Sequence, residues 1–219
     1  MILNPSELET HCINRQFKAY LLEDTTYSLP YKKLYIDANK TIIEETKQTD
    51  AIYIIVSGVV IETKNQTVLH FLGKEECLGL DTMFHGSTAT SSIITLTKTV
   101  LYKIPASEVT RKLAERPAGI QALHKLLTHH TLLLKTRIAA QISNYDKVLQ
   151  ALLHLGYLYG EEKNNAIYMT MYFSKKMLAN YLHLSYATVA SVCKRLVAQG
   201  ILHDEPHGMI IYPKNDANL

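Results

Sequence analysis

The sequence predicts an α+β fold: an N-terminal antiparallel β-roll or jelly-roll barrel, a long α-helix, and a C-terminal winged helix-turn-helix. Short β-branched segments separated by polar turns fill residues 32–105, and this spacing is typical of a sandwich or closed barrel. Apolar residues then recur at helical spacing through residues 118–143. Two short amphipathic segments and a hairpin pattern follow. We therefore expect a barrel domain at 1–115, a long helix at 116–142 and a C-terminal domain at 143–219.

Composition limits the class of protein. With 219 residues, of which 47% are apolar, the chain is long enough for one large or two small cores. A net charge of only +3 means that any nucleic-acid binding must come from local patches. Three widely separated cysteines, Cys12, Cys77 and Cys193, predict neither a disulfide framework nor a metal site. No signal-peptide pattern and no apolar run near ~20 residues is present, so we expect a cytoplasmic protein without membrane association.

The barrel region begins after a mixed N-terminal segment, in which Pro5 is expected to open a short helix. Ser57-Gly58 predicts a tight hairpin between two of the strands. The predicted strands lie at 34–36, 41–44, 52–56, 59–62, 68–71, 92–96 and 100–104.

The long helix is predicted from Pro117, which suits a first helical position, to about Ser143. A helix of this length exceeds what one small domain needs. One interpretation is a helix buried along its own sheet; we favour a coiled coil between two copies of the chain. The predicted dimer interface, which follows a near-heptad seam, consists of Ile120, Leu123, Leu127, His130, Leu134 and Ile138.

The C-terminal domain is expected to start with a helix that Ser143 caps and Gly160 ends. A strand at 166–172 precedes two helices, from Ser174 to Leu182 and from Ser185 to Gln199. Met177, Leu178, Tyr181 and Leu182 should form one apolar face, and Val189, Val192, Leu196 and Val197 the other. Two strands around the turn 204–208 form a hairpin, the wing. The second helix of such a motif enters the DNA major groove; the alternative is a helical hairpin packed inside another domain.

Charge favours the DNA-binding interpretation. No Asp or Glu occurs between Lys163 and His203, whereas five basic residues do, namely Lys163, Lys175, Lys176, Lys194 and Arg195. A basic surface without acids suits a phosphate backbone.

The order of barrel, long helix and winged helix resembles the Crp–Fnr family of bacterial transcription regulators. The barrel block 41–60 (TIIEETKQTDAIYIIVSGVV) is similar to the family's cyclic-nucleotide-binding-type domain, with Thr46 in place of the usual glycine. The block 178–202 is similar to its helix-turn-helix, with His183 in place of the turn glycine. That position often needs a positive φ, which histidine tolerates. The resemblance implies a homodimer on a pseudo-palindromic promoter site, with RNA polymerase as a further partner.

The resemblance does not extend to a cyclic nucleotide. Family members that bind cyclic AMP use a Glu and an Arg-Ser pair, but no Lys or Arg occurs here between Lys74 and Lys98. A phosphate needs such a partner or a ring of amides. We expect an unidentified effector, if any, and no cofactor, because three scattered cysteines cannot hold the family's iron–sulfur cluster. The corresponding effector pocket consists of Leu78, Gly79, Leu80, Thr88, Thr90 and Ser91.

The resemblance also assigns DNA contacts. The positions that read bases in the cyclic-AMP branch are Tyr186, Ala187 and Ser191 here. Without an arginine, bidentate guanine recognition is lost, which predicts A·T-rich half-sites. Phosphate contacts are expected from residues at the two helix starts, and Lys194 could contact either bases or phosphates. The full predicted set is Ser174, Lys175, Lys176, Ser185, Tyr186, Ala187, Thr188, Ser191, Lys194 and Arg195.

Enzyme chemistry is not predicted. The ten histidines show no ligand spacing such as HxH or HExxH, and there is no nucleophile elbow or P-loop. The alternative function is a small-ligand sensor or barrel metalloenzyme whose C-terminal domain mediates protein contacts.

Overall fold

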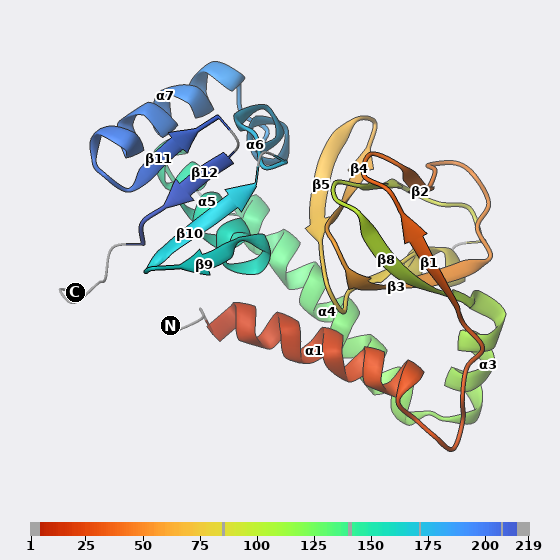
Figure 1. Ribbon diagram of the computed structural model, residues 1–219. Coiled ribbons are helices and arrows are strands. Elements are labelled where there is room, and N and C mark those ends of the chain that lie inside the picture. The colour runs from red at the N-terminus through yellow and green to blue at the C-terminus, as the bar shows by residue number, and fades with distance from the viewer. Residues whose placement is uncertain (1–4, 85, 140–141, 171, 207, 214–219) are drawn as a thin grey trace. The chain divides into compact units, whose positions relative to one another are not determined.

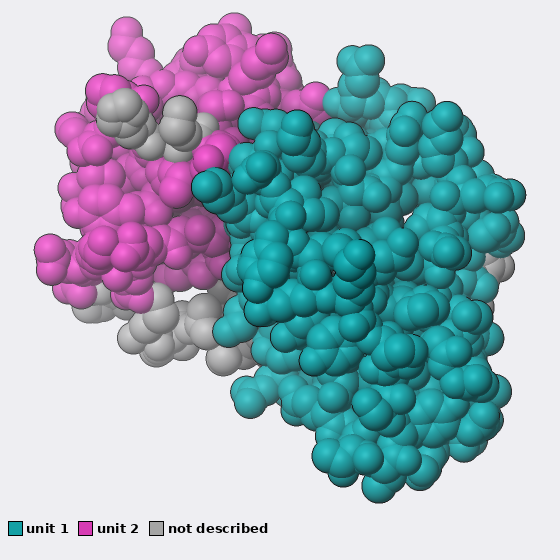
Figure 2. Space-filling view, turned by 45° about the vertical axis from the view of Figure 1, so that its right-hand side comes forward, with its two compact units in different colours: residues 1–140 teal, residues 141–219 magenta. Residues whose placement is uncertain are grey.

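The computed structural model describes residues 5–84, 86–139, 142–170, 172–206 and 208–213 of the chain (Figure 1). It consists of two compact units, residues 1–140 and 141–219, which are coloured separately in Figure 2. Each unit has its own sheets and its own core, and each is described in turn.

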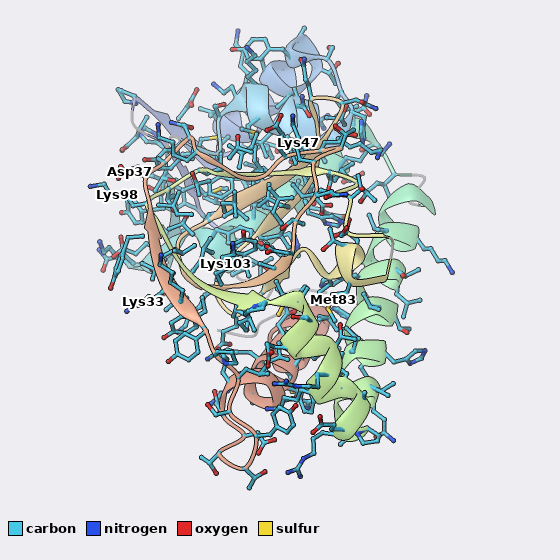
Figure 3. All side chains as sticks on the ribbon, turned by 90° about the vertical axis from the view of Figure 1, so that its right-hand side faces the viewer. Lys33, Asp37, Lys47, Met83, Lys98 and Lys103 are labelled. Carbon is cyan, nitrogen blue, oxygen red and sulfur yellow. The ribbon has the colours of Figure 1, made fainter. Side chains whose placement is uncertain are left out.

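Unit 1 contains two antiparallel four-stranded sheets, in the orders β1-β8-β3-β6 and β2-β7-β4-β5. The strands are β1 (Lys32–Ile36), β2 (Thr41–Ile43), β3 (Ala51–Ser57), β4 (Val60–Lys64), β5 (Thr67–Leu72), β6 (Cys77–Leu78), β7 (Ser92–Thr95) and β8 (Thr99–Pro105). In Figure 3, Lys33 lies near the start of the edge strand β1, and Asp37 directly follows its end. The predicted antiparallel β-roll is confirmed.

Two cores flank the first sheet, because alternate residues of a strand face opposite sides. On β3, Tyr53 and Ile55 point between the two sheets, where they meet Leu101 of β8. Ile52 and Ile54 point the other way, into a core that helices close. These helices are α1 (Pro5–Leu22), α2 (Leu80–Phe84), α3 (Ala106–Glu115) and α4 (Ala118–Ala139). A strand that is buried on both faces explains the unbroken apolar run at 51–56.

The Ser57-Gly58 hairpin prediction is wrong. The flanking strands β3 and β4 belong to different sheets, so this turn is a corner of the roll. Gly58 has φ +100°, and a Cβ there would lie 2.6 Å from Thr99 Oγ1. Glycine is therefore required by both the backbone conformation and the close approach of β8.

The N-terminal helix is longer than predicted: α1 spans 18 residues. Phe17 and Leu21 of α1 are buried in the helical core, and α1 packs alongside α4 (Figure 1). Over residues 12–22, where the side chains are described, burial is confined to Asn14, Phe17 and Leu21, which explains why the apolar pattern of this part of the helix is weak in the sequence.

The long helix α4 buries one part of the predicted dimer seam within its own chain. Leu123 is 6% exposed and lies in the helical core with Leu126. Leu123 therefore offers little surface to the predicted dimer interface. Ile120 and Leu127 remain 52% and 42% exposed. Leu134 is half-buried, and the side chain of Ile138 lies outside the described residues.

His130 also lies toward the covered side of α4. It is partly buried, and burial, followed by the neighbouring His129, lowers the pKa of its imidazole. His130 therefore offers less exposed surface to the predicted dimer seam than Ile120 and Leu127 do within unit 1.

Unit 2 is a winged helix-turn-helix, as predicted. Its elements are α5 (Asn144–Tyr159), β9 (Glu161–Lys163), β10 (Ala166–Thr170), α6 (Lys175–Leu182), α7 (Tyr186–Ala198), β11 (Leu202–Glu205) and β12 (Gly208–Ile211). The sheet order is β11-β12-β10-β9, all antiparallel. Ser143 caps α5 by accepting a hydrogen bond from Asp146 N. The short strand β9 extends the sheet at the edge opposite the wing strand β11.

Candidate nucleic-acid interface

Local capping sets the two helices of the helix-turn-helix. Ser174 Oγ accepts a hydrogen bond from Met177 N at 3.3 Å, and Ser185 Oγ accepts one from Thr188 N at 3.0 Å. His183 ends α6 with φ 55° and ψ 39°, the left-handed conformation expected for this turn. Each cap satisfies a backbone group that the helix end leaves unpaired. The boundaries predicted for both helices are confirmed to within a residue.

The outward face of α7 carries three of the predicted DNA contacts. At about 100° per residue, Ala187, Ser191 and Lys194 form one exposed stripe. The opposite stripe, Val189, Cys193 and Leu196, is buried at 0–1% exposure. We call residues 187, 191 and 194 the outward stripe. The helix therefore presents these side chains to solvent and uses the other face for packing.

The apolar face predicted for α7 needs one correction. Val197 is 40% exposed, whereas Cys193 takes its place in the core. Tyr186, at the first turn, is 59% exposed on the flank of the outward stripe. Burial raises the pKa of the Cys193 thiol, and it raises that of Cys77 to about 12. Both cysteines are consequently held as neutral thiols, which are poor nucleophiles.

Arg195 is engaged within unit 2. Its guanidinium carbon lies 4.6 Å from the centre of the Tyr145 ring on α5. The Tyr145 hydroxyl in turn donates to Gln199 Oε1. Arg195 thus joins α7 to α5 through a cation–π contact. Its neighbour Lys194, and not Arg195, belongs to the outward stripe.

Lys175 is paired with an acid that the sequence places outside the basic segment. Its ammonium donates to Asp204 of the wing strand β11. This hydrogen bond raises the pKa of Lys175. The basic segment contains no acid in the sequence, but in the folded domain Asp204 lies against one of its lysines. Ser174, Lys176 and Thr188 remain at the helix starts, with Ser174 and Lys176 exposed and Thr188 half-buried.

Two hydroxyls of the predicted effector pocket are hydrogen-bonded to carboxylates. Thr90 Oγ1 donates to Asp81 Oδ2 at 2.6 Å, and Ser91 Oγ donates to Glu62 Oε1 at 2.5 Å. Burial raises the pKa of Glu62, with Asp81 contributing in the same direction. Sequence reasoning missed both acids, since neither stands near a cation at motif spacing.

The apolar members of that predicted pocket pack into the cores. Leu78 lies between the sheets and Leu80 lies in the helical core. Gly79, with φ +80°, connects them, and Thr88 is exposed. Leu78 and Leu80 are therefore held by packing in two different cores.

The described residues were compared with the patterns expected of a metal site and of a membrane-spanning helix. Within the described residues no group of three or more His, Cys, Asp or Glu side chains is placed to hold a metal ion. None of the described helices combines the length and apolar character needed to cross a membrane.

Comparison with known proteins agrees with this architecture. Residues 33–116 match the cyclic nucleotide-binding domain family. No curated protein sequence matches the chain. Among solved structures, FixK2 from Bradyrhizobium japonicum is similar at TM-score 0.69 and 16% identity, over 86% of this chain and 95% of that one.

Two further structures extend the likeness. CLP of Xanthomonas campestris, a c-di-GMP-responsive global regulator, matches at TM-score 0.67 and 18% identity, over 93% of this chain and 100% of that one. A cyclic nucleotide-binding domain protein of Listeria monocytogenes EGD-e matches at TM-score 0.64 and 20% identity, over 93% and 98%. The predicted resemblance in fold is confirmed: the chain has the barrel, helix and winged-helix architecture of these solved structures.

Proposed function

We propose that this protein is a sequence-specific DNA-binding transcription regulator, not an enzyme, and that it acts as a homodimer on a pseudo-palindromic promoter site. The observation that carries the proposal is the outward stripe of α7, which presents Ala187, Ser191 and Lys194 opposite a fully packed face. A recognition helix needs this combination of a rigid inner face and a free outer one. RNA polymerase is the expected protein partner.

Exposed apolar side chains on α4 support dimerisation. Ile120 and Leu127 are seven residues apart, so they lie on one side of the helix with Leu134. A second copy of α4 would bury this surface. Two copies would also supply the two recognition helices that a pseudo-palindromic site requires.

The proposed effector is not a cyclic nucleotide. Glu62 and Asp81 accept hydrogen bonds from the hydroxyls that a phosphate would need. Their negative charge would repel the phosphate of a cyclic mononucleotide, and equally those of a cyclic dinucleotide such as the one to which CLP responds. Either no effector is needed, or the effector is a molecule without a phosphate.

The expected operator has A·T-rich half-sites. Ala187 suits contact with a thymine methyl, while Ser191 and Tyr186 offer single hydrogen bonds to base edges. Lys176 and Thr188, at the helix starts, are the expected phosphate contacts. These contacts would position the helix without specifying the sequence.

Selection of duplexes from a random library by the full-length protein tests the proposal. We expect enrichment of a two-fold symmetric sequence whose half-sites are about one helical turn apart, roughly 34 Å. Affinity for the enriched duplex should fall when Lys175→Ala and Lys176→Ala are combined. Lys47→Ala with Lys98→Ala, which removes two exposed charges from unit 1, is the matched control. Absence of any sequence preference at moderate salt would contradict the proposal.

A further inference from the structure

The pair formed by Lys175 and Asp204 lies within the proposed DNA-binding surface. Lys175 is the first residue of α6 and directly follows the cap Ser174. Because its ammonium donates to Asp204 of the wing strand β11, it lies between the wing and the start of α6, where a phosphate contact is expected.

Asp204 is directed at this ammonium by the geometry of β11. Successive residues of a strand point to opposite faces. His203 and Glu205 share the other face, where His203 Nε2 lies 3.9 Å from Glu205 Oε1. Asp204 alone of these three side chains is hydrogen-bonded to Lys175. Two adjacent acids on one strand thus have different partners.

The pair is accessible to solvent. The side chains of Lys175 and Asp204 are 25% and 45% exposed. Ion pairs with this exposure are weak and are screened by salt. A DNA phosphate can therefore compete with the Asp204 carboxylate for the same ammonium, and the carboxylate also repels the approaching phosphate.

We propose that Asp204 is an intramolecular competitor of the DNA backbone for Lys175, and that it lowers the affinity of the protein for DNA of any sequence. This inference rests on the proposed DNA-binding function. Because phosphate contacts carry no sequence information, this competition changes the affinity for specific and unrelated duplexes by the same factor. Asp204 thus sets the overall affinity for DNA without touching a base.

Asp204→Asn tests the inference, since it removes the charge and keeps the size of the side chain. Affinity for the duplex enriched by the wild-type protein should rise about two- to fivefold for each half-site. The slope of log affinity against log salt should steepen by about 0.9 for each half-site, because one more phosphate is neutralised. Affinity for an unrelated duplex should rise by the same factor.

Two comparisons isolate the Lys175 contact. Glu205→Gln removes an equal charge from the next residue, on the other face of β11, and should change the affinity much less. In a Lys175→Ala background, Asp204→Asn should lose most of its effect. An equal gain from both acid substitutions would show a general charge effect and overturn the inference. A lower affinity of Asp204→Asn would show that Asp204 aims Lys175 at the phosphate, which would also overturn it.

Salt elution from immobilised heparin decides the inference even if no duplex is enriched. Heparin is a polyanion without base edges, so its elution reports the positive surface charge of the protein and no base contact. Asp204→Asn should elute at higher salt than both the wild-type protein and Glu205→Gln. Failure to enrich a duplex would count against the proposed function alone, whereas unchanged heparin elution of Asp204→Asn would count against the competition by Asp204.

Discussion

The ring of Tyr20, on α1, occupies the space that a side chain at Gly119, on α4, would need. A Cβ built on Gly119 would lie 2.0 Å from Tyr20 Cζ. The Tyr20 hydroxyl donates to the backbone oxygens of Lys112 at 3.0 Å and Arg116 at 3.1 Å, at the end of α3. One phenol therefore connects the N-terminal helix to the junction between α3 and the long helix.

Gly119→Ala should destabilise the protein by about 2 kcal/mol, because forcing an extra carbon into a packed site costs more than the roughly 1 kcal/mol by which alanine favours a helix. Urea denaturation of the full chain measures the change. In a Tyr20→Ala background the ring is absent, so Gly119→Ala should be neutral or stabilising there. Equal destabilisation in both backgrounds would show that Tyr20 is not the obstacle.

Glu62→Gln should stabilise the protein at neutral pH. Burial raises the folded pKa of Glu62 above its ordinary value of 4.5. Between the two values the folded state binds more protons than the unfolded state, so stability falls as the pH rises through that interval. Glutamine carries no charge and can still accept the hydrogen bond from Ser91.

Thermal unfolding followed against pH measures this effect. The midpoint of Glu62→Gln should exceed that of the wild-type protein by roughly 2–4 °C at pH 7, and the gain should vanish below pH 4.5. Glu44→Gln, at an exposed position beside β2, is the control and should give no gain. A destabilised Glu62→Gln at pH 7 would mean that the charged carboxylate has a favourable partner.

Features set by local sequence were predictable, whereas contacts between distant segments were not. The caps Ser174 and Ser185 and the left-handed His183 follow from a few adjacent residues, so the helix-turn-helix was predicted correctly. Lys112 shows the opposite case: it is fully buried, and its ammonium donates to Tyr27 O at 2.7 Å. A local sequence pattern predicts that a lysine lies at the surface, because lysines are rarely fully buried.

In the candidate site, too, features set by local sequence were predictable and contacts between distant residues were not. The outward stripe of α7 follows from helical spacing, but the pair Lys175–Asp204 joins residues 29 positions apart. Leu123 has the heptad spacing of a dimer contact, yet its own chain covers it. Spacing identifies which residues share a face, and only tertiary packing decides which partner that face meets.

Leu127→Glu should weaken the dimer without unfolding the chain, because Leu127 is 42% exposed within unit 1. Leu123→Ala should instead destabilise the fold by about 2–5 kcal/mol, since it empties a buried site. Sedimentation velocity reports the first effect and thermal unfolding the second. Thr128→Glu adds the same charge at an exposed neighbour away from the Ile120–Leu127 stripe, and should leave the dimer intact. Equal dissociation by Thr128→Glu would contradict this interface.

Lys194→Ala and Arg195→Ala should have different consequences, although the two residues are adjacent and carry the same charge. Lys194 lies in the outward stripe, so its loss should lower DNA affinity. If Lys194 contacts a phosphate, the salt slope should also decrease by about 0.9 per half-site; if it contacts a base, the loss of about 1–3 kcal/mol should appear only with the enriched duplex.

Arg195 stacks on Tyr145 at 4.6 Å, so Arg195→Ala should lower the unfolding midpoint through the loss of a contact worth about 0.5–1 kcal/mol. Tyr145→Ala should lower the midpoint in the same way, and the two substitutions should not be additive, because they remove one contact. Filter binding at several salt concentrations, combined with thermal unfolding, separates DNA contact from packing. A salt slope reduced as much by Arg195→Ala as by Lys194→Ala would show that DNA displaces Arg195 from the Tyr145 ring.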